Sequence, residues 1–351
     1  MTSLRMTTKG IYIYGIVPNF YSTDLFRSIE TSGVYAISHE AISAIVSDRE
    51  TTCLDSMTRE SLAHLLVHHQ QTIEELQGNG FTMIIPMRLG TMVSSKEEVL
   101  TILSRGFDLM MDTLKKIEYL TENDMAVTWS DFPGILKEIA GYPEIISLKE
   151  NIMKAGEIIK KVDQVKIGML VKEKLDEKNK KVELKILDLL SPICLDMKTH
   201  EVMNDQMVTN TAFLLDRKNT KTFENIVDQL DQEYNGALNF KLVGPLPCYS
   251  FYTIEIKELD PGQVVLAKSE LGLKDEIAED EIKKAYLEQA KKFHPDACLH
   301  NVDKEHFNQI TNAYHTLLDY SAAVRQSSRK ENISLSIEKI MDNLILVKIK
   351  E

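Results

Sequence analysis

The sequence lacks the features that mark secreted and membrane-spanning proteins. Its four cysteines are widely spaced and include no Cys-x-x-Cys pair, so we expect reduced thiols rather than a disulfide framework or a zinc site. The N-terminal residues lack the apolar core of a signal peptide, and no apolar run approaches the roughly 18 residues of a membrane-spanning helix. These absences predict a soluble, cytoplasmic protein.

Positive charge is also scarce. The chain has 41 Lys and Arg against 53 Asp and Glu, which gives a formal net charge of -12. Sequence-independent nucleic-acid binding relies on clustered cations that contact phosphates, and adsorption to an anionic membrane surface also requires basic clusters. The charge balance therefore predicts neither a nucleic-acid partner nor a membrane partner.

Motifs of catalysis and cofactor binding are missing as well. There is no Gly-x-Ser-x-Gly elbow, no Walker pattern and no Gly-x-Gly-x-x-Gly fingerprint. His64 and His68 have the helical spacing at which two imidazoles can share a metal ion, but no third ligand accompanies them. His69 falls in an apolar stripe, which predicts a hydrogen-bonded core histidine. We therefore predict no enzymatic activity, no cofactor and no metal site.

The 351 residues are enough for two or three domains. The first part of the chain alternates irregularly between strand and helix patterns. Strand patterns occur at residues 11–17, 34–48 and 82–85, and helix patterns occur at 56–77 and from a Ser95–Glu98 capping box to about 117. Such alternation favours an α+β domain over a doubly wound one, and we assign this domain to residues 1–135.

A second α+β domain is predicted over residues 136–258. The seam between the two domains is expected at 121–150, which contains a short strand pattern and a turn at Pro133-Gly134. Residues 162–190 are helix-prone with a charged centre, which indicates a solvated helix face or an inter-helix turn. The patterns that follow are strand, helix, strand and strand, at 207–215, 220–234, 238–243 and 250–258. This order suits a ferredoxin-like sheet that is covered on one face.

Residues 282–296 predict the first half of a helical hairpin. Apolar positions recur at helical spacing from Ile282 to Phe293, and Pro295 prevents the helix from continuing. A second amphipathic run begins at Phe307 and continues through Leu317. Two helices with facing apolar stripes, joined by a loop that starts His-Pro-Asp, form such a hairpin.

This hairpin resembles the J domain, the module by which DnaJ-type co-chaperones engage DnaK-type ATPases. The resemblance is carried by Leu271-Gly272-Leu273, Ile282, Ala285-Tyr286, Phe293-His294-Pro295-Asp296, Phe307, Ile310, Ala313-Tyr314 and Leu317. It implies a J module over residues 259–326 that contacts a DnaK-type chaperone. The implied contact residues are His294, Pro295, Asp296, Lys283, Lys284, Lys291 and Lys292.

The basic face implied by this resemblance is weak. Leu287 and Glu288 occupy two positions where the J-domain family usually has basic residues, and residues 280–293 carry a net charge of only +1. Arg325 lies two residues past the usual place of the family's Lys-Arg pair. We therefore expect modest electrostatic steering. The alternatives are a module that stimulates a DnaK ATPase and a degenerate module retained for packing.

Residues 8–258 resemble the gas vesicle GvpF/GvpL family. Three stretches carry the likeness, namely Tyr12-Ile13-Tyr14-Gly15-Ile16-Val17, Ile85-Pro86-Met87-Arg88-Leu89-Gly90-Thr91 and Gly244-Pro245-Leu246-Pro247-Cys248-Tyr249-Ser250-Phe251. Leu89 and Cys248 stand where the family usually has Phe and Pro. The resemblance implies two α+β domains, the second with a modified ferredoxin-like sheet, and a role in gas vesicle building through contact with the shell protein GvpA.

Arg88 is the one charged residue of these stretches that we consider as a partner contact. Its guanidinium can grip an acidic group of the shell protein in a bidentate manner. The alternative, which we favour, is an internal ion pair between the sheet and the second helix.

The tail, residues 327–351, has its own pattern. Residues 327–330 read as a linker and 337–343 as a short helical turn, and 344–350 have strand composition. Because an unpaired apolar strand invites aggregation, we expect this strand to return to residues 250–258 in the second domain's sheet. The alternatives are a local hairpin with residues 264–267 and a disordered tail.

These patterns together predict two α+β domains followed by a helical J hairpin and a returning strand. We expect a gas vesicle accessory or structural protein that binds GvpA during assembly, meets other gas vesicle accessory proteins, and recruits a DnaK-type chaperone. One alternative is a general DnaJ-type co-chaperone that binds unfolded clients. The other is a minor structural vesicle component with a silent J module. The expected location is the cytoplasm, at the gas vesicle.

Overall fold

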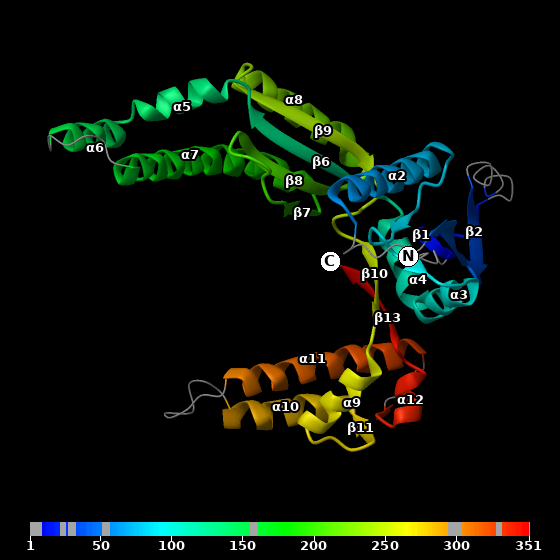
Figure 1. The fold of residues 1–351 in the computed structure, drawn as a ribbon. Coiled ribbons are helices and arrows are strands. Elements are labelled where there is room, and N and C mark those ends of the chain that lie inside the picture. Colours follow the sequence, from blue (N-terminus) through cyan, green and yellow to red (C-terminus); the bar gives the residue numbers. More distant parts are fainter. Residues whose placement is uncertain are drawn as a thin grey trace, which may run out of the picture. The chain divides into compact units, whose positions relative to one another are not determined.

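The computed structural model describes residues 9–21, 26, 33–50, 57–154, 161–293, 304–327 and 332–350 (Figure 1). The chain divides into two compact units. The first combines Met1–Glu118 with Tyr252–Glu351, and the second comprises Tyr119–Phe251. The fold is mixed α+β, with antiparallel sheets in both units and a helical segment toward the C-terminus.

The first unit contains a five-stranded antiparallel sheet. Its strands are β1 (Lys9–Pro18), β2 (Val34–His39), β3 (Ile42–Glu50), β4 (Ile85–Pro86) and β5 (Met92–Val93). The order is β2-β3-β1-β4, and β5 also pairs with β1. The strands predicted at 11–17 and 34–48 are confirmed, with Glu40 at a φ of 50° in the turn between β2 and β3. The strand predicted at 82–85 is only the two-residue β4.

The described helices that accompany this sheet are α2 (Arg59–Gly78), α3 (Lys96–Arg105) and α4 (Phe107–Ile117). The single helix predicted from residue 95 to 117 is wrong, because Gly106 separates α3 from α4. A Cβ atom at Gly106 would lie 2.9 Å from both the Met110 Cε and the Val347 Cγ1 atoms. The absence of a side chain at Gly106 therefore leaves room for the C-terminal tail.

The second unit is built on the sheet β7-β8-β6-β9, which is antiparallel throughout. Its strands are β6 (Leu120–Trp129), β7 (Asp196–Thr199), β8 (Met207–Asp216) and β9 (Leu238–Leu246). The predicted domain boundary at residue 135 therefore differs from the division in the structure. Because β6 pairs with β8 on one side and β9 on the other, residues 120–129 are central to the second unit.

Helices pack on one face of this sheet. They are α7 (Lys161–Leu190) and α8 (Thr220–Tyr234), with the short turns η2 (Ser191–Ile193) and η3 (Arg217–Asn219). Ile186 and Leu190 of α7 and Phe223 of α8 share a buried core with Met125 and Val127. The helix-prone run at 162–190 is thus one continuous helix with no turn at its charged centre.

Two further helices, α5 (Phe132–Ala140) and α6 (Pro143–Lys154), pack on the N-terminal half of α7. The turn predicted at Pro133-Gly134 is wrong. Proline is tolerated in the first turn of a helix, and the Asp131 carboxylate caps α5 by accepting a hydrogen bond from the Gly134 amide at 2.9 Å.

The J module consists of α9 (Pro261–Glu270), β11 (Glu276–Ala278), α10 (Glu279–Phe293) and α11 (Lys304–Ser327). It is followed by β12 (Asn332–Ser334) and α12 (Ile337–Met341), and β12 pairs with β11. Val264, Ile282, Ile310 and Leu317 lie in one buried core. Residues 264–267, considered at the sequence level as a hairpin partner of the tail, belong to helix α9.

The tail ends in β13 (Ile345–Lys350), which pairs antiparallel with β10 (Thr253–Glu258). The predicted pairing with residues 250–258 is confirmed, but the assignment of this pair to the second domain's sheet is wrong. After β9 the chain turns away through residues 247–252, and β10 instead joins the first unit. There, the Arg88 amide donates a hydrogen bond to the Ile254 carbonyl at 2.8 Å.

Strand β13 has one buried residue on each face, Leu346 and Val347. Leu346 contributes to the core of the J module, whereas Val347 packs against the site of Gly106. Asp319 on α11 binds Lys257 of β10 and Lys348 of β13. Burial alone would raise the pKa of Asp319, but hydrogen bonds from these two lysines outweigh it and lower the pKa. The J module is therefore inserted between two paired strands and attached at both ends.

The contact between Gly106 and β13 predicts a specific sensitivity to side-chain size. Gly106→Ala should destabilise the protein by about 1–3 kcal/mol, because the new methyl group overlaps Val347 and Met110. The φ of -85° at Gly106 is open to any residue, so the penalty comes from contact alone. Denaturant unfolding measures the loss, and hydrogen exchange should accelerate at the β13 amides.

Gly168→Ala is the matched control, because a Cβ atom at this position on α7 meets nothing within 4 Å. It should stabilise the helix by about 0.5–1 kcal/mol. Equal stability changes in the two variants would contradict the close approach of β13 to Gly106.

Candidate interaction surfaces

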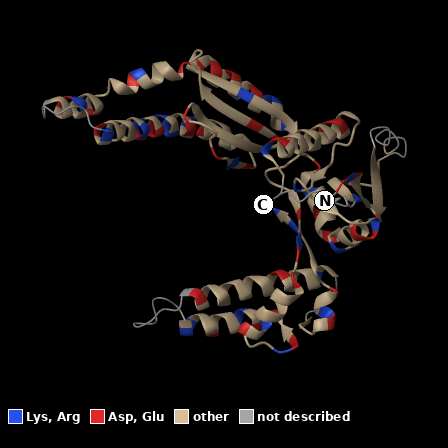
Figure 2. Cartoon of the chain, in the orientation of Figure 1, with Lys and Arg blue, Asp and Glu red and all other residues tan. Residues whose placement is uncertain are grey.

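Helix α10 carries the lysines predicted to contact a chaperone, and basic and acidic positions both occur along this helix (Figure 2). The four lysines Lys283, Lys284, Lys291 and Lys292 are exposed, as are Leu287 and Glu288 between them. Ile282 is buried on the opposite side, and the Tyr286 and Tyr314 rings stack at 4.3 Å between α10 and α11. Lys284 forms an ion pair with Asp280 at 2.5 Å. The face is therefore of mixed charge with an apolar centre.

His294, Pro295 and Asp296 lie outside the described residues. The helix ends on either side are described. Phe293, the last residue of α10, contacts the His306 ring on α11 edge-to-face at 4.3 Å between centroids. Arg325, near the end of α11, forms an ion pair with Glu279 in the first turn of α10. The pair of helices is thus fixed at both ends.

A buried aromatic cluster lies beneath α2 in the first unit. The Tyr12 hydroxyl and the His69 Nδ1 atom are 2.8 Å apart, and the Gly90 amide donates to the same hydroxyl at 3.2 Å. Burial lowers the pKa of His69 from 6.5 to about 4, with smaller effects of Arg49 and His68. His69 is therefore neutral at pH 7, and its Nδ1 atom is hydrogen-bonded to the Tyr12 hydroxyl. This confirms the prediction of a hydrogen-bonded core histidine.

Arg88 forms an ion pair with Glu255 of β10. The internal pair predicted for Arg88 is therefore present, but its partner lies on β10 instead of the second helix. The Arg88 side chain is still 62% exposed, so one edge of the guanidinium faces solvent.

The stretch that follows β9 is tied to a buried carboxyl group. Glu122 on β6 is 1% exposed, and it accepts hydrogen bonds from the Ser250 amide and the Ser250 hydroxyl, each at 2.8 Å. Burial raises the pKa of Glu122 to about 8, and the neighbouring Asp124 contributes to the rise. A bulge in the β6–β9 pairing lies at Asn123, whose Oδ1 atom would be 2.5 Å from a Cβ at Gly244. Gly244 therefore has room for no side chain.

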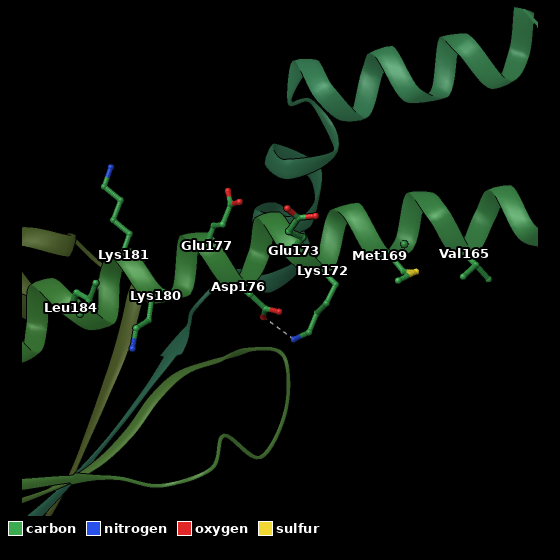
Figure 3. Close-up of a pocket in the computed structure, with 10 residues that line it drawn as sticks. Val165, Met169, Lys172, Glu173, Asp176, Glu177, Lys180, Lys181 and Leu184 are labelled. Atoms are coloured by element: carbon green, nitrogen blue, oxygen red, sulfur yellow. Dashed lines mark ion pairs between the residues drawn. The ribbon is translucent and has the colours of Figure 1, made fainter. Parts of the chain in front are cut away.

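The solvent-facing side of α7 carries alternating charges (Figure 3). Lys172 lies between Asp176 at 2.9 Å and Asp205 at 2.7 Å, and Lys180 pairs with Glu183 at 2.7 Å. Val165, Met169 and Leu184 are exposed apolar side chains on the same helix. A shallow pocket lies on this side of α7, and all the residues that line it belong to α7. The pocket is therefore the open surface of one helix rather than an enclosed site.

Residues 10–253 match the family model described as gas vesicle synthesis protein GvpL/GvpF. The chain belongs to the GvpL/GvpF family. Residues 269–324 match the DnaJ domain, so this GvpL/GvpF protein carries a C-terminal DnaJ domain, the J module of the fold. Both families are typically non-enzymatic.

Similar proteins are found among cyanobacterial gas vesicle proteins. Gas vesicle protein F of Nostoc sp. (strain PCC 7120) is 22% identical over 249 residues, which cover 70% of this chain and 99% of the relative. Gas vesicle protein F of Microcystis aeruginosa is 20% identical, with 70% and 98% covered. The crystal structure of GvpF from Anabaena sp. PCC7120 superposes with a TM-score of 0.55 at 20% identity, over 69% of this chain and 98% of that one. This likeness establishes the fold of the GvpL/GvpF part.

Local sequence patterns do not reveal the buried carboxyl group of this GvpL/GvpF protein. Glu122 lies in the range predicted as a seam between domains, because the polar residues Glu122 to Asp124 resemble a loop, and no local pattern marks the burial of its carboxyl group. Cys194 and Cys248 are free thiols, whereas Cys53 and Cys298 lie outside the described residues.

No cluster of three metal-ligating side chains occurs in the part of the chain that is described. No described helix combines the length and apolar character needed to cross a membrane.

The neutral His69 predicts a specific pH dependence of stability. Its pKa is about 4 in the folded state and 6.5 when unfolded, so the unfolded chain binds more protons between these values. Stability is therefore lost as pH falls through this window, by about 2 kcal/mol between pH 7 and pH 5. His69→Gln should remove this part of the pH dependence, as measured by urea unfolding at both pH values.

His64→Gln is the control, because His64 is exposed on the same helix. It should retain the pH dependence of the unaltered protein. If His69→Gln and the unaltered protein lose equal stability between pH 7 and pH 5, His69 does not stay neutral in the fold.

Proposed function

We propose that this protein is a gas vesicle assembly factor with two binding activities. Its GvpL/GvpF part binds the shell protein GvpA during assembly, and its J module recruits a DnaK-type chaperone. The observation that carries the proposal is the insertion of a DnaJ domain between β10 and β13, the two paired strands that dock on the N-terminal sheet of a GvpL/GvpF fold. The expected site of action is the cytoplasm, at the growing vesicle.

The physical reason for this combination is the behaviour of the shell protein before assembly. Subunits with large apolar surfaces aggregate when they are unassembled. A co-chaperone tethered to a shell-binding part raises the local concentration of the chaperone at those subunits. Other gas vesicle accessory proteins are further proposed partners, because shell growth brings them to the same place.

The α10 face supports chaperone binding that is weak and sensitive to salt. Exposed charge pairs contribute roughly 0–1 kcal/mol each and are screened by salt. Lys284 is already paired with Asp280, whereas Lys283 and Lys291 form no ion pair with a described residue. The proposed chaperone contacts are the four lysines Lys283, Lys284, Lys291 and Lys292, together with His294, Pro295 and Asp296. Lys284 would have to give up its pair with Asp280 to bind the chaperone.

Arg88 remains a proposed contact for an acidic group of the shell protein. Its pair with Glu255 leaves the guanidinium partly exposed, so a partner carboxylate would have to share Arg88 with Glu255.

A second candidate is a minor structural component of the vesicle with a silent J module. The exposed Leu287 and Glu288 favour it, because they interrupt the basic face of α10. The general co-chaperone alternative is less well supported, because the described GvpL/GvpF part has packed cores instead of a Met- or Gly-rich flexible stretch.

The chaperone role predicts a loss of function at His294. His294→Gln should abolish stimulation of the cognate DnaK ATPase, because the substitution removes the imidazole of the His-Pro-Asp loop and leaves the apolar stripes of both helices intact. Steady-state ATP hydrolysis measures the effect, and stimulation by the unaltered protein should fall as salt is raised.

His315→Gln is the matched control, because His315 is an exposed histidine on α11 of the same module. It should stimulate the ATPase as the unaltered protein does. Identical ATPase rates with the unaltered protein, with His294→Gln and with no added protein would support the silent module instead.

The division of labour predicts that the J module is dispensable for GvpA binding. Truncation after residue 258 is a poor test, because it also removes β13. Residues 260–343 should instead be replaced by an Asn-Gly turn, since the Leu259 amide already donates to the Leu344 carbonyl at 2.7 Å. This variant retains the β10–β13 hairpin, and we expect it to capture GvpA as the full chain does in a pull-down.

The truncated chain serves as the comparison and should be less stable, because β10 loses its partner strand. A loop-replacement variant that is folded by circular dichroism but does not capture GvpA would overturn this division.

A further inference from the structure

Strand β9 is an exposed edge of the second unit's sheet. It lies at one end of the order β7-β8-β6-β9, and no strand in the described part of the chain pairs with its other side. Of its nine residues only Leu238 is buried, and Leu242 and Val243 are each 36% exposed. The unpaired backbone groups of such an edge are a template for pairing with another strand, and a charged residue such as Lys241 restricts which strand can pair with it.

The backbone groups that point away from β6 can be identified from the register. The Ser130 amide donates to the Ala237 carbonyl, and the pairing continues as Trp129 with Leu238 and Val127 with Phe240. In an antiparallel ladder hydrogen-bonded pairs alternate with non-bonded pairs. The N–H and C=O groups of Leu238, Phe240 and Leu242 therefore point outward, toward the open edge.

The side chains along this edge define what would fit. Phe240 packs with the helix-covered core, and Leu242 continues the same face at its exposed end. Lys241 projects from the opposite face, is exposed, and forms no ion pair with a described residue. Pro245 has no amide hydrogen, so it ends the usable edge on the C-terminal side.

We propose that the β9 edge binds an extended segment of a partner protein, with apolar side chains on one face, by strand addition. Outward backbone groups at Leu238, Phe240 and Leu242 supply main-chain hydrogen bonds, and a partner apolar side chain covers Leu242. An acidic partner side chain lies opposite Lys241, because cross-strand pairs of opposite charge are favourable. This surface is separate from the J module and goes beyond the proposed function.

A second copy of the chain fits this edge poorly. Two-fold pairing centred on Lys241 would place two lysines directly opposite each other, which is destabilising. Pairing centred on Leu242 would place Lys241 opposite Val243 and leave the ammonium group without a counter-charge. The charge at Lys241 therefore favours an acidic partner strand over self-association.

The probe is an acetylated peptide of alternating sequence, Ser-Val-Thr-Val-Glu-Val-Thr-Ser, added to the full-length protein. A second peptide carries Lys in place of Glu. Hydrogen exchange should show protection of residues 238–243 by the Glu peptide, and fluorescence anisotropy gives its affinity. Lys241→Glu should weaken binding of the Glu peptide about fivefold and reverse the preference between the peptides.

Lys221→Glu, an exposed charge reversal on α8, is the matched control and should leave both affinities unchanged. Leu242→Pro tests the backbone, because it removes one outward N–H and proline is tolerated at edge positions that face solvent. It should abolish protection by either peptide. If this variant does not fold, the Lys241→Glu exchange of preference decides the matter.

Three results would overturn the proposal. The first is an absence of protection at 238–243 with both peptides. The second is equal weakening by Lys221→Glu and Lys241→Glu. The third is protection of 238–243 that depends on protein concentration without peptide, which would assign the edge to a second copy of the chain.

Discussion

The first unit depends on the pairing of β13 with β10, which brings the last residues of the chain back to the N-terminal sheet. This pairing brings Val347 against Gly106 and Leu346 into the core of the J helices. Full burial of an aliphatic side chain contributes about 1.5–3 kcal/mol, so these two residues carry a substantial part of the attachment. Asp319, held between Lys257 and Lys348, adds a charged tie between the same elements.

The second unit depends on a different constraint, the position of β6 at the centre of its sheet. Glu122 on β6 accepts both polar hydrogens of Ser250, so the stretch after β9 is fixed by a carboxyl group with a raised pKa. Asn123 lies where a side chain at Gly244 would have to go. The third family stretch, residues 244–251, is therefore held against the distant strand β6 by hydrogen bonding and by close packing.

Much of the fold was predictable from local patterns. The ends of α8 were given by Thr220 and by the left-handed Asn235, and the strand at 207–215 by its apolar run. The full extent of β6 was not, because the polar residues Glu122 to Asp124 look like a loop unless their pairing partners are known. The break at Gly106 was also hidden, since the reason for it lies some 240 residues away, a separation at which only tertiary contact carries information.

The candidate sites divide in the same way. The His-Pro-Asp loop and the lysines of α10 are predictable from a motif, because a motif is recognised from the local sequence without knowledge of the rest of the fold. The local sequence around Arg88 does not give its ion-pair partner. The partner is Glu255 on β10, and the position of β10 depends on its pairing with β13. The open edge of β9 had no sequence signal at all. Whether a strand lies at the edge of a sheet depends on which other strands pair with it, and the sequence of the strand itself does not contain this information.

The insertion point of the J module has a consequence for how such proteins are modified. Leu259 and Leu344, which flank the inserted segment, are joined by a main-chain hydrogen bond. The backbone of the host strands is therefore closed like a hairpin, and the inserted segment adds the cover over Leu346 and the pairing of Lys257 and Lys348 with Asp319. A different domain whose ends lie close together should be accepted there once Leu346 is replaced by a polar residue, so this position is suited to the grafting of reporters or targeting domains onto gas vesicle proteins.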